Sequence, residues 1–263
     1  MASRIRIRSR PADHSDQVFR VIATERPDPA QDATAFVLVH GIGTSHRYFQ
    51  RLHDTLALTA PVISVDLPGF GDLPRPDADI DVSQMADGLS ELLRECVSGP
   101  VVLVGHSMGA QWVVETALRH PELVAHVVVI GPVTDEKHRT VFAQARALAL
   151  DMLGESPLIN AVVLADYLRC GMPWYMTQLR HMLVYPIEDR VRELTKPLLI
   201  IRGSSDPVAG RTWCRRLRDL APGASTLVEV PGGHHVVQFA APAAVACAIR
   251  SHTAPRAPEA IGT

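Results

Sequence analysis

A short apolar run leads directly into a serine flanked by two glycines. Residues 101–104 are followed by Gly105-His106-Ser107-Met108-Gly109 and then by a helix-compatible stretch, 110–120. A strand that turns this sharply into a helix leaves no room for side chains at the glycines. The turn would expose the Ser107 hydroxyl at the carboxyl edge of a sheet, with the Met108 N–H at the positive end of a helix. The motif therefore predicts that Ser107 is a nucleophile and that Met108 supplies half of an oxyanion hole.

Apolar runs alternate with amphipathic stretches along most of the chain. The expected strands are short, rich in β-branched residues and bounded by Gly, Pro or Asp. They are 35–39, 61–65, 101–104, 127–130, 197–201 and 226–230. The expected helices are 47–58, 82–96, 110–120, 210–220 and 244–252. This alternation predicts an α/β fold with a mostly parallel central sheet flanked by helices on both faces.

The two ends of the chain have different patterns. Residues 3–10 alternate arginine with isoleucine, which is typical of an edge strand with one solvated face, and 17–23 predict a second strand before a Pro- and Asp-rich turn at 26–32. No apolar segment follows the basic residues, so we do not expect a signal peptide. At the other end, 253–263 are expected to form a disordered tail.

One interval lacks a convincing strand. Residues 132–196 hold helical stretches at 141–153 and 160–169 and then a run rich in methionine and aromatic residues. Because this insertion lies between core segments 1–131 and 197–252, near the edge where Ser107 opens, it predicts a mobile helical cap or lid. The alternative is an extra helical pair that only packs on the core. We expect Trp174, Tyr175 and Met176 to line an apolar substrate pocket, together with His40.

A serine nucleophile needs a base and an acid, and both are sought where strands end. Asp206 follows the strand at 197–201, and His235 follows the strand at 226–230. Asp206 is preferred to Asp135, which follows an earlier strand but lies in what looks like a charged helix start. His234 remains the alternative to His235.

The second oxyanion donor is expected in the loop after an early strand. The sequence there is His40-Gly41-Ile42-Gly43-Thr44, so we expect the Ile42 N–H to act beside that of Met108. His40 is expected to shape this loop through its own hydrogen bonds.

Composition excludes several other classes of protein. The formal charge is −2 and no basic stripe interleaved with aromatic residues appears, so a nucleic-acid partner is not expected. No apolar run is long enough for a membrane span. The four cysteines are widely spaced and the histidines scattered, which favours reduced thiols in a cytoplasmic protein without a metal site. The expected partner is a small-molecule substrate, and no oligomeric state is favoured.

Together these motifs resemble the α/β-hydrolase superfamily, in particular its esterase-like branch. The matching features are the H-G-x-G loop at His40, a D-x-P-G-x-G turn at Asp66, the G-H-S-M-G elbow, the R-G-x-x-D-P loop at Arg202 and a late histidine. In the family that histidine often precedes a proline by seven residues, as His235 precedes Pro242. The chain departs from the pattern in having His234 where Gly is common and Ala240 where Glu often follows.

The resemblance implies an α/β-hydrolase fold and the triad Ser107, Asp206 and His235. It also implies hydrolysis of a carboxylic ester, lactone or thioester through an acyl-serine, without a cofactor. A C–C bond hydrolase, or a perhydrolase or haloperoxidase-like enzyme, would use the same triad. A non-hydrolytic binder of small molecules on this fold is a further alternative.

Overall fold

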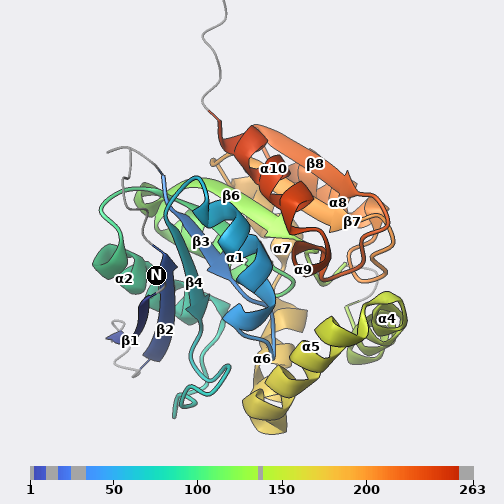
Figure 1. The fold of residues 1–263 in the computed structure, drawn as a ribbon, viewed down its shortest axis with the longest axis horizontal. Helices are drawn as coiled ribbons and strands as arrows, with labels where there is room; N and C mark the ends of the chain where they lie inside the picture. Colours follow the sequence, from blue (N-terminus) through green and yellow to red (C-terminus); the bar gives the residue numbers. More distant parts are fainter. Residues whose placement is uncertain (1–2, 10–16, 25–33, 136–138, 255–263) are drawn as a thin grey trace, which may run out of the picture.

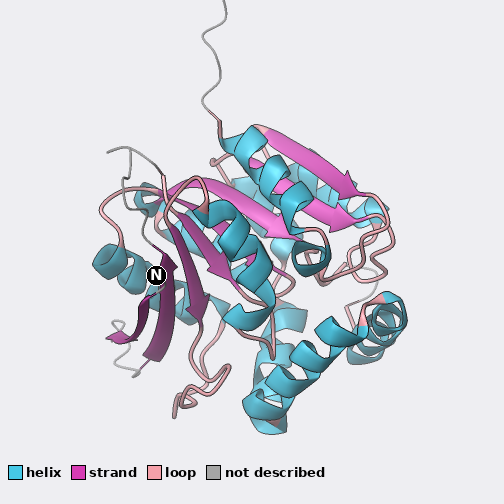
Figure 2. Cartoon of the chain, in the orientation of Figure 1, coloured by secondary structure: helices cyan, strands magenta, loops and turns pink. Residues whose placement is uncertain are grey.

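A computed structural model describes residues 3–9, 17–24, 34–135 and 139–254 of the chain. Its centre is an eight-stranded sheet in the order β1-β2-β4-β3-β5-β6-β7-β8. The strands are β1 (Ser3–Ser9), β2 (Gln17–Thr24), β3 (Phe36–Val39), β4 (Val62–Asp66), β5 (Val101–His106), β6 (Val124–Ile130), β7 (Leu198–Gly203) and β8 (Ser225–Val230). Only β1 and β2 pair antiparallel to their neighbours. The expected α/β fold with a mostly parallel sheet is therefore confirmed (Figure 2).

Alternating side chains of the central strands enter two separate cores. In β5, Val101 and Leu103 face one layer of helices, whereas Val102 and Val104 face the other. The first core includes residues of α2 (Val82–Cys96), α3 (Gly109–Arg119) and α8 (Arg211–Leu220). The second includes residues of α1 (Gln50–Ala57), α9 (Val237–Ala240) and α10 (Pro242–Thr253), seen against the sheet in Figure 1. Strands buried on both faces explain the unbroken apolar runs of the sequence.

Some elements differ from the sequence-based expectations. The predicted helix at 47–58 begins as a 3-10 turn, His46–Phe49, because the Ser45 side chain caps the Arg47 N–H before α1 starts. Asp135 lies outside any helix, since α4 (Val141–Gly154) begins after Thr140, whose side chain accepts from the Ala143 N–H. The predicted turn at 26–32 and residues 255–263 of the predicted tail lie outside the described residues.

The long interval between β6 and β7 is mostly helical. It holds α4, α5 (Pro157–Cys170), α6 (Met172–Val184) and α7 (Ile187–Arg190), and the turn Val191–Glu193. The run rich in methionine and aromatic residues forms α6, which has a proline in its first turn, a position where the missing N–H costs nothing. Helices α4, α5 and α6, which we call the inserted helices, lie together on one side of the body (Figure 1).

The turn from β5 into α3 is tightly enclosed. A Cβ atom at Gly105 would lie 2.3 Å from the Gly109 carbonyl oxygen, and one at Gly109 would lie 2.5 Å from the Val39 carbonyl oxygen. Ser107 itself has a φ of 57°, in the left-handed region that non-glycine residues rarely occupy. The helix can start directly beside the sheet only because the two glycines lack side chains.

Gly105→Ala should therefore destabilise the protein, because the new methyl group meets fixed backbone. We expect a loss of about 1–3 kcal/mol or more in the free energy of unfolding, as overpacking of a close-packed site costs. Gly99→Ala is the matched control, since a Cβ atom there has no neighbour within 4 Å. Urea denaturation measures both. Equal midpoints for the two variants would show that the turn tolerates a side chain.

Candidate active site

The three predicted triad residues meet at the carboxyl edge of the sheet. Ser107 follows β5, and its Oγ lies 3.2 Å from Nε2 of His235. Nδ1 of His235, which follows β8, lies 3.0 Å from Oδ2 of Asp206, which follows β7. All three residues are buried, with 3–8% of their surface exposed. In this arrangement His235 can donate Nδ1–H to Asp206 and accept the Ser107 proton at Nε2, whereas Asp135 does not take the acid position.

Burial and charge act in opposite directions on the Asp206–His235 pair. Burial alone would lower the pKa of His235, but the negative charge and hydrogen bond of Asp206, together with the charges of Asp151 and Glu155, outweigh it, so this pKa is raised. Burial would likewise raise the pKa of Asp206, but the charge of His235 and three hydrogen bonds lower it. The pair therefore favours a carboxylate beside a histidine that readily takes up a proton.

Hydrogen bonds from neighbouring residues fix the conformation of the Asp206 loop. Oδ1 of Asp206 accepts from the N–H groups of Val208 and Ala209 at 2.8 and 3.0 Å. The guanidinium of Arg202 donates to the carbonyl oxygens of Asp206 and Ala209 at 3.1 and 2.7 Å. These contacts leave the second carboxylate oxygen of Asp206 for His235.

The loop after β3 lies directly beside Ser107. A Cβ atom on Gly41 would come within 2.9 Å of the Ser107 Cβ, so this glycine allows the loop to approach the serine closely. Within the described residues, neither the Ile42 N–H nor the Met108 N–H donates to a protein acceptor. Two unpaired amides near the serine are what an oxyanion hole requires.

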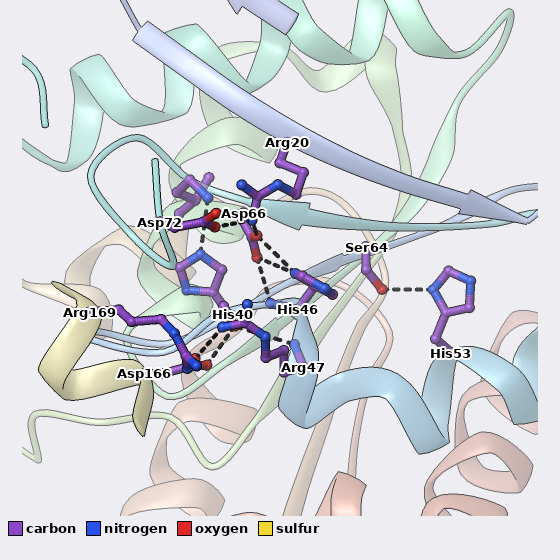
Figure 3. Close-up of polar contacts among 12 residues, drawn as sticks. Arg20, His40, His46, Arg47, His53, Ser64, Asp66, Asp72, Asp166 and Arg169 are labelled. Atoms are coloured by element: carbon purple, nitrogen blue, oxygen red, sulfur yellow. Dashed lines mark hydrogen bonds and ion pairs between the residues drawn. The ribbon is translucent and has the colours of Figure 1, made fainter. Parts of the chain in front are cut away.

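Two buried carboxylates anchor this loop (Figure 3). Asp66 accepts from the backbone N–H of His46 at 2.6 Å and contacts Nδ1 of the His46 ring at 2.8 Å. It also accepts from the guanidinium of Arg20 at 3.1 Å. Asp166 of α5 accepts from the hydroxyl of Ser45 and from Arg47. The geometry of the loop thus depends on both the sheet and an inserted helix.

A cavity of about 190 Å³ opens onto Ser107 and His235. Its remaining walls come from the loop after β3, from the loops that follow β6 and β7, and from all three inserted helices. These walls include Ile42, Thr44, Tyr48, Val133, Val141, Gln144, Leu148, Val163, Tyr167, Tyr175, Met176, Leu179, Met182 and Val208. Among the described lining residues, none is Asp, Glu, Lys or Arg.

Two of the four predicted pocket residues line this cavity, and two do not. Tyr175 and Met176 are in its wall. Trp174 instead packs on the opposite side of α6, against Phe70 at 6.2 Å between ring centroids and over Gly69. His40 is fully buried below the loop, where its Nδ1–H donates to the Gly41 carbonyl and its Nε2 accepts from the Leu67 N–H. Both positions serve packing and loop shape rather than the cavity.

Sequence reasoning missed a hydrogen-bonded chain behind the triad. The Gly41 N–H donates to the Tyr48 hydroxyl at 2.7 Å, and this hydroxyl donates to Nδ1 of His106 at 2.8 Å. The Nε2–H of His106 in turn donates to the His235 carbonyl at 2.9 Å. Burial, with the nearby His235, lowers the pKa of His106 to about 3, so its ring stays neutral. The chain links the loop after β3 to the backbone of His235. Nothing in the local sequence around Tyr48 signals this contact.

The described residues contain no group of three or more His, Cys, Asp or Glu side chains that could hold a metal ion. None of the helices in the described ranges is long and apolar enough to cross a membrane.

The model of the family described as "Alpha/beta hydrolase family" matches residues 36–248. The chain belongs to the alpha/beta hydrolase family. The match begins at β3 and ends inside α10, so it includes the elbow, the inserted helices and the loops that carry Asp206 and His235.

Proteins similar to this chain have been given different names. The chain is 27% identical over 228 residues to a 2-(acetamidomethylene)succinate hydrolase from Mesorhizobium japonicum, covering 77% of this chain and 82% of that protein. It is 34% identical over 118 residues to a probable 1-acylglycerol-3-phosphate O-acyltransferase from Oryza sativa subsp. japonica, covering 43% of this chain but only 28% of the rice protein. An esterase structure from Thermogutta terrifontis is similar with a TM-score of 0.79 and 19% identity, covering 94% and 97% of the two chains.

Asp206→Asn tests whether the carboxylate of Asp206 stabilises the protonated form of His235. We expect ester turnover to fall by about 10³–10⁴-fold, because the amide no longer fixes and stabilises a protonated His235. The base has to be neutral, so activity is lost as pH falls through the pKa of His235, which in the wild type lies above the usual value of about 6.5. Without the carboxylate that pKa falls, and the acid limb of kcat/KM moves to lower pH.

Initial rates measured from about pH 5 to about pH 9 give both profiles. Asp135→Asn is the control and should keep its rate and its acid limb. A larger loss for Asp135→Asn than for Asp206→Asn would move the acid to Asp135.

Proposed function

We propose that this chain is a serine hydrolase that cleaves carboxylic esters of small, neutral, largely apolar compounds. The observation that carries the proposal is the hydrogen-bonded row from Ser107 through His235 to Asp206, which opens into an uncharged cavity. Lactones and thioesters also have an acyl carbon that these three residues could attack in the same way.

In this mechanism the Ser107 Oγ attacks the acyl carbon while Nε2 of His235 takes the hydroxyl proton. The negative oxygen of the tetrahedral intermediate accepts hydrogen bonds from the N–H groups of Ile42 and Met108. His235 then gives its proton to the leaving alcohol oxygen, and an acyl-Ser107 remains. Water repeats the sequence on the acyl-enzyme and releases the carboxylic acid and the free serine.

The cavity walls favour a neutral acyl group. Its volume of about 190 Å³ is smaller than the range of about 300–1,000 Å³ usual for drug-sized ligands. An ionised substrate group would be buried here without a Lys or Arg partner among the described lining residues, which is unfavourable. The Mesorhizobium relative carries succinate, a dicarboxylate, in its name. We infer that this chain differs from it in substrate charge.

We further propose that the segment 132–196 acts as a substrate-selecting cap. Each of its three long helices supplies wall residues, among them Leu148, Val163 and Met176. Unbranched and flexible side chains such as Met176 adapt to different acyl groups.

Matched nitrophenyl esters test the proposal. We expect the neutral butyrate ester to exceed the hemisuccinate ester in kcat/KM by about tenfold or more, since an unpaired buried carboxylate costs more than about 1.4 kcal/mol. Ser107→Ala should lose about 10³-fold or more with both esters and keep the wild-type melting temperature.

Preference for the hemisuccinate would contradict the neutral substrate class. Wild-type turnover by a folded Ser107→Ala protein would contradict the serine mechanism itself.

A further inference from the structure

The loop that carries His235 is bound by two carboxylates of an inserted helix. The His235 N–H donates to Oδ1 of Asp151 at 2.8 Å, and the Val236 N–H donates to Oε1 of Glu155 at 2.9 Å. Asp151 lies in the last turn of α4, and Glu155 is its C-cap residue. Two successive amides beside the candidate base are therefore paired across more than 80 residues of sequence.

The same end of α4 fits closely against the neighbouring histidine. A Cβ atom on Gly154 would lie 2.0 Å from Cε1 of His234, so the imidazole covers this glycine directly. Nδ1 of His234 lies 3.6 Å from Oδ1 of Asp151. His234 thus occupies a packing position on α4, while the adjacent His235 points to Ser107 and Asp206.

The carboxylate of Asp151 is buried, which disfavours its charged form. It is 2% exposed, and burial raises its pKa to about 6 despite the opposing charge and N–H of His235. The carboxylates of Asp206 and Glu155 raise its pKa further, and the imidazole of His234 also faces it, with Nδ1 3.6 Å from Oδ1. A buried carboxylate of this kind is retained when it satisfies groups that would otherwise be unpaired. Here the group it satisfies is the amide of the candidate base.

We propose that Asp151 and Glu155 are positioning residues that bind the backbone of the His235 loop. Through these contacts the position of α4 determines how the His235 ring lies relative to Ser107. This rests on the proposed role of His235. Neither carboxylate lines the cavity, so neither is in place to contact the substrate. Their effect is exerted through the loop and also through their negative charges, both of which raise the pKa of His235.

Two consequences follow from this arrangement. Loss of the acceptor leaves the His235 N–H buried without a partner and loosens the ring relative to Ser107, which affects the chemical step more than substrate binding. Loss of the charge alone removes one of the groups that raise the pKa of His235, so the acid limb of activity moves to lower pH.

Steady-state kinetics of Asp151→Ala and Asp151→Asn separate the two. We expect Asp151→Ala to lower kcat by about 10–100-fold, as loss of an orienting partner typically does, with KM changed less than about twofold. Asp151→Asn keeps an acceptor oxygen and should recover most of kcat at neutral pH, with its acid limb shifted to lower pH. Asp189→Ala is the control, because it removes an exposed carboxylate whose ion pair is with Arg192 and not with the His235 loop.

Glu155→Ala supplies an independent arm if Asp151→Ala fails to fold, and it should also lower kcat at constant KM. Wild-type kcat in folded Asp151→Ala and Glu155→Ala proteins would overturn the inference. So would an Asp151→Asn variant that is as impaired as Asp151→Ala with an unmoved acid limb. Ser107→Ala, measured beside them, reports separately on the serine mechanism, because only that variant tests the nucleophile.

Discussion

The turn at Ser107 depends on the absence of side chains at Gly105 and Gly109, and the rest of the site is arranged around that turn. Without the glycines, α3 could not lie against β3 and β5 as it does, since a Cβ atom would meet backbone within 2.5 Å. The positive φ of Ser107 then directs its hydroxyl toward the loops after β7 and β8. Because the strands are parallel, these loops end at the same edge, and each has to supply only one side chain.

Much of this site could be predicted, because its signals are local. Alternating apolar strands and amphipathic helices indicated the sheet and its two helix layers. The order of Ser107, Asp206 and His235 along the chain, each in the turn or loop after a strand, predicted that they would meet. The structure brings these side chains together at 3.0 and 3.2 Å. Their catalytic roles remain proposals that the variants above test.

The placement of the inserted helices had no comparable signal. In α5 Leu168 is exposed whereas Ile159 is buried, and in α6 Met172 is exposed whereas Leu179 is buried, so apolar residues alone do not tell which face is covered. This is why Trp174 was expected in the cavity but lies against Phe70 instead. The contacts of Asp151 and Glu155 with the His235 loop were missed for a related reason. A carboxylate that accepts from a distant backbone amide leaves no pattern in the sequence.

Covalent labelling with a fluorophosphonate probe tests the central claim most directly. Such a probe reacts with a serine activated by a neighbouring base, and peptide mass spectrometry locates the adduct. The account predicts one adduct per chain, on Ser107, formed much more slowly in His235→Gln than in His234→Gln. An adduct on another residue, or fast labelling of Ser107 in folded His235→Gln, would contradict it.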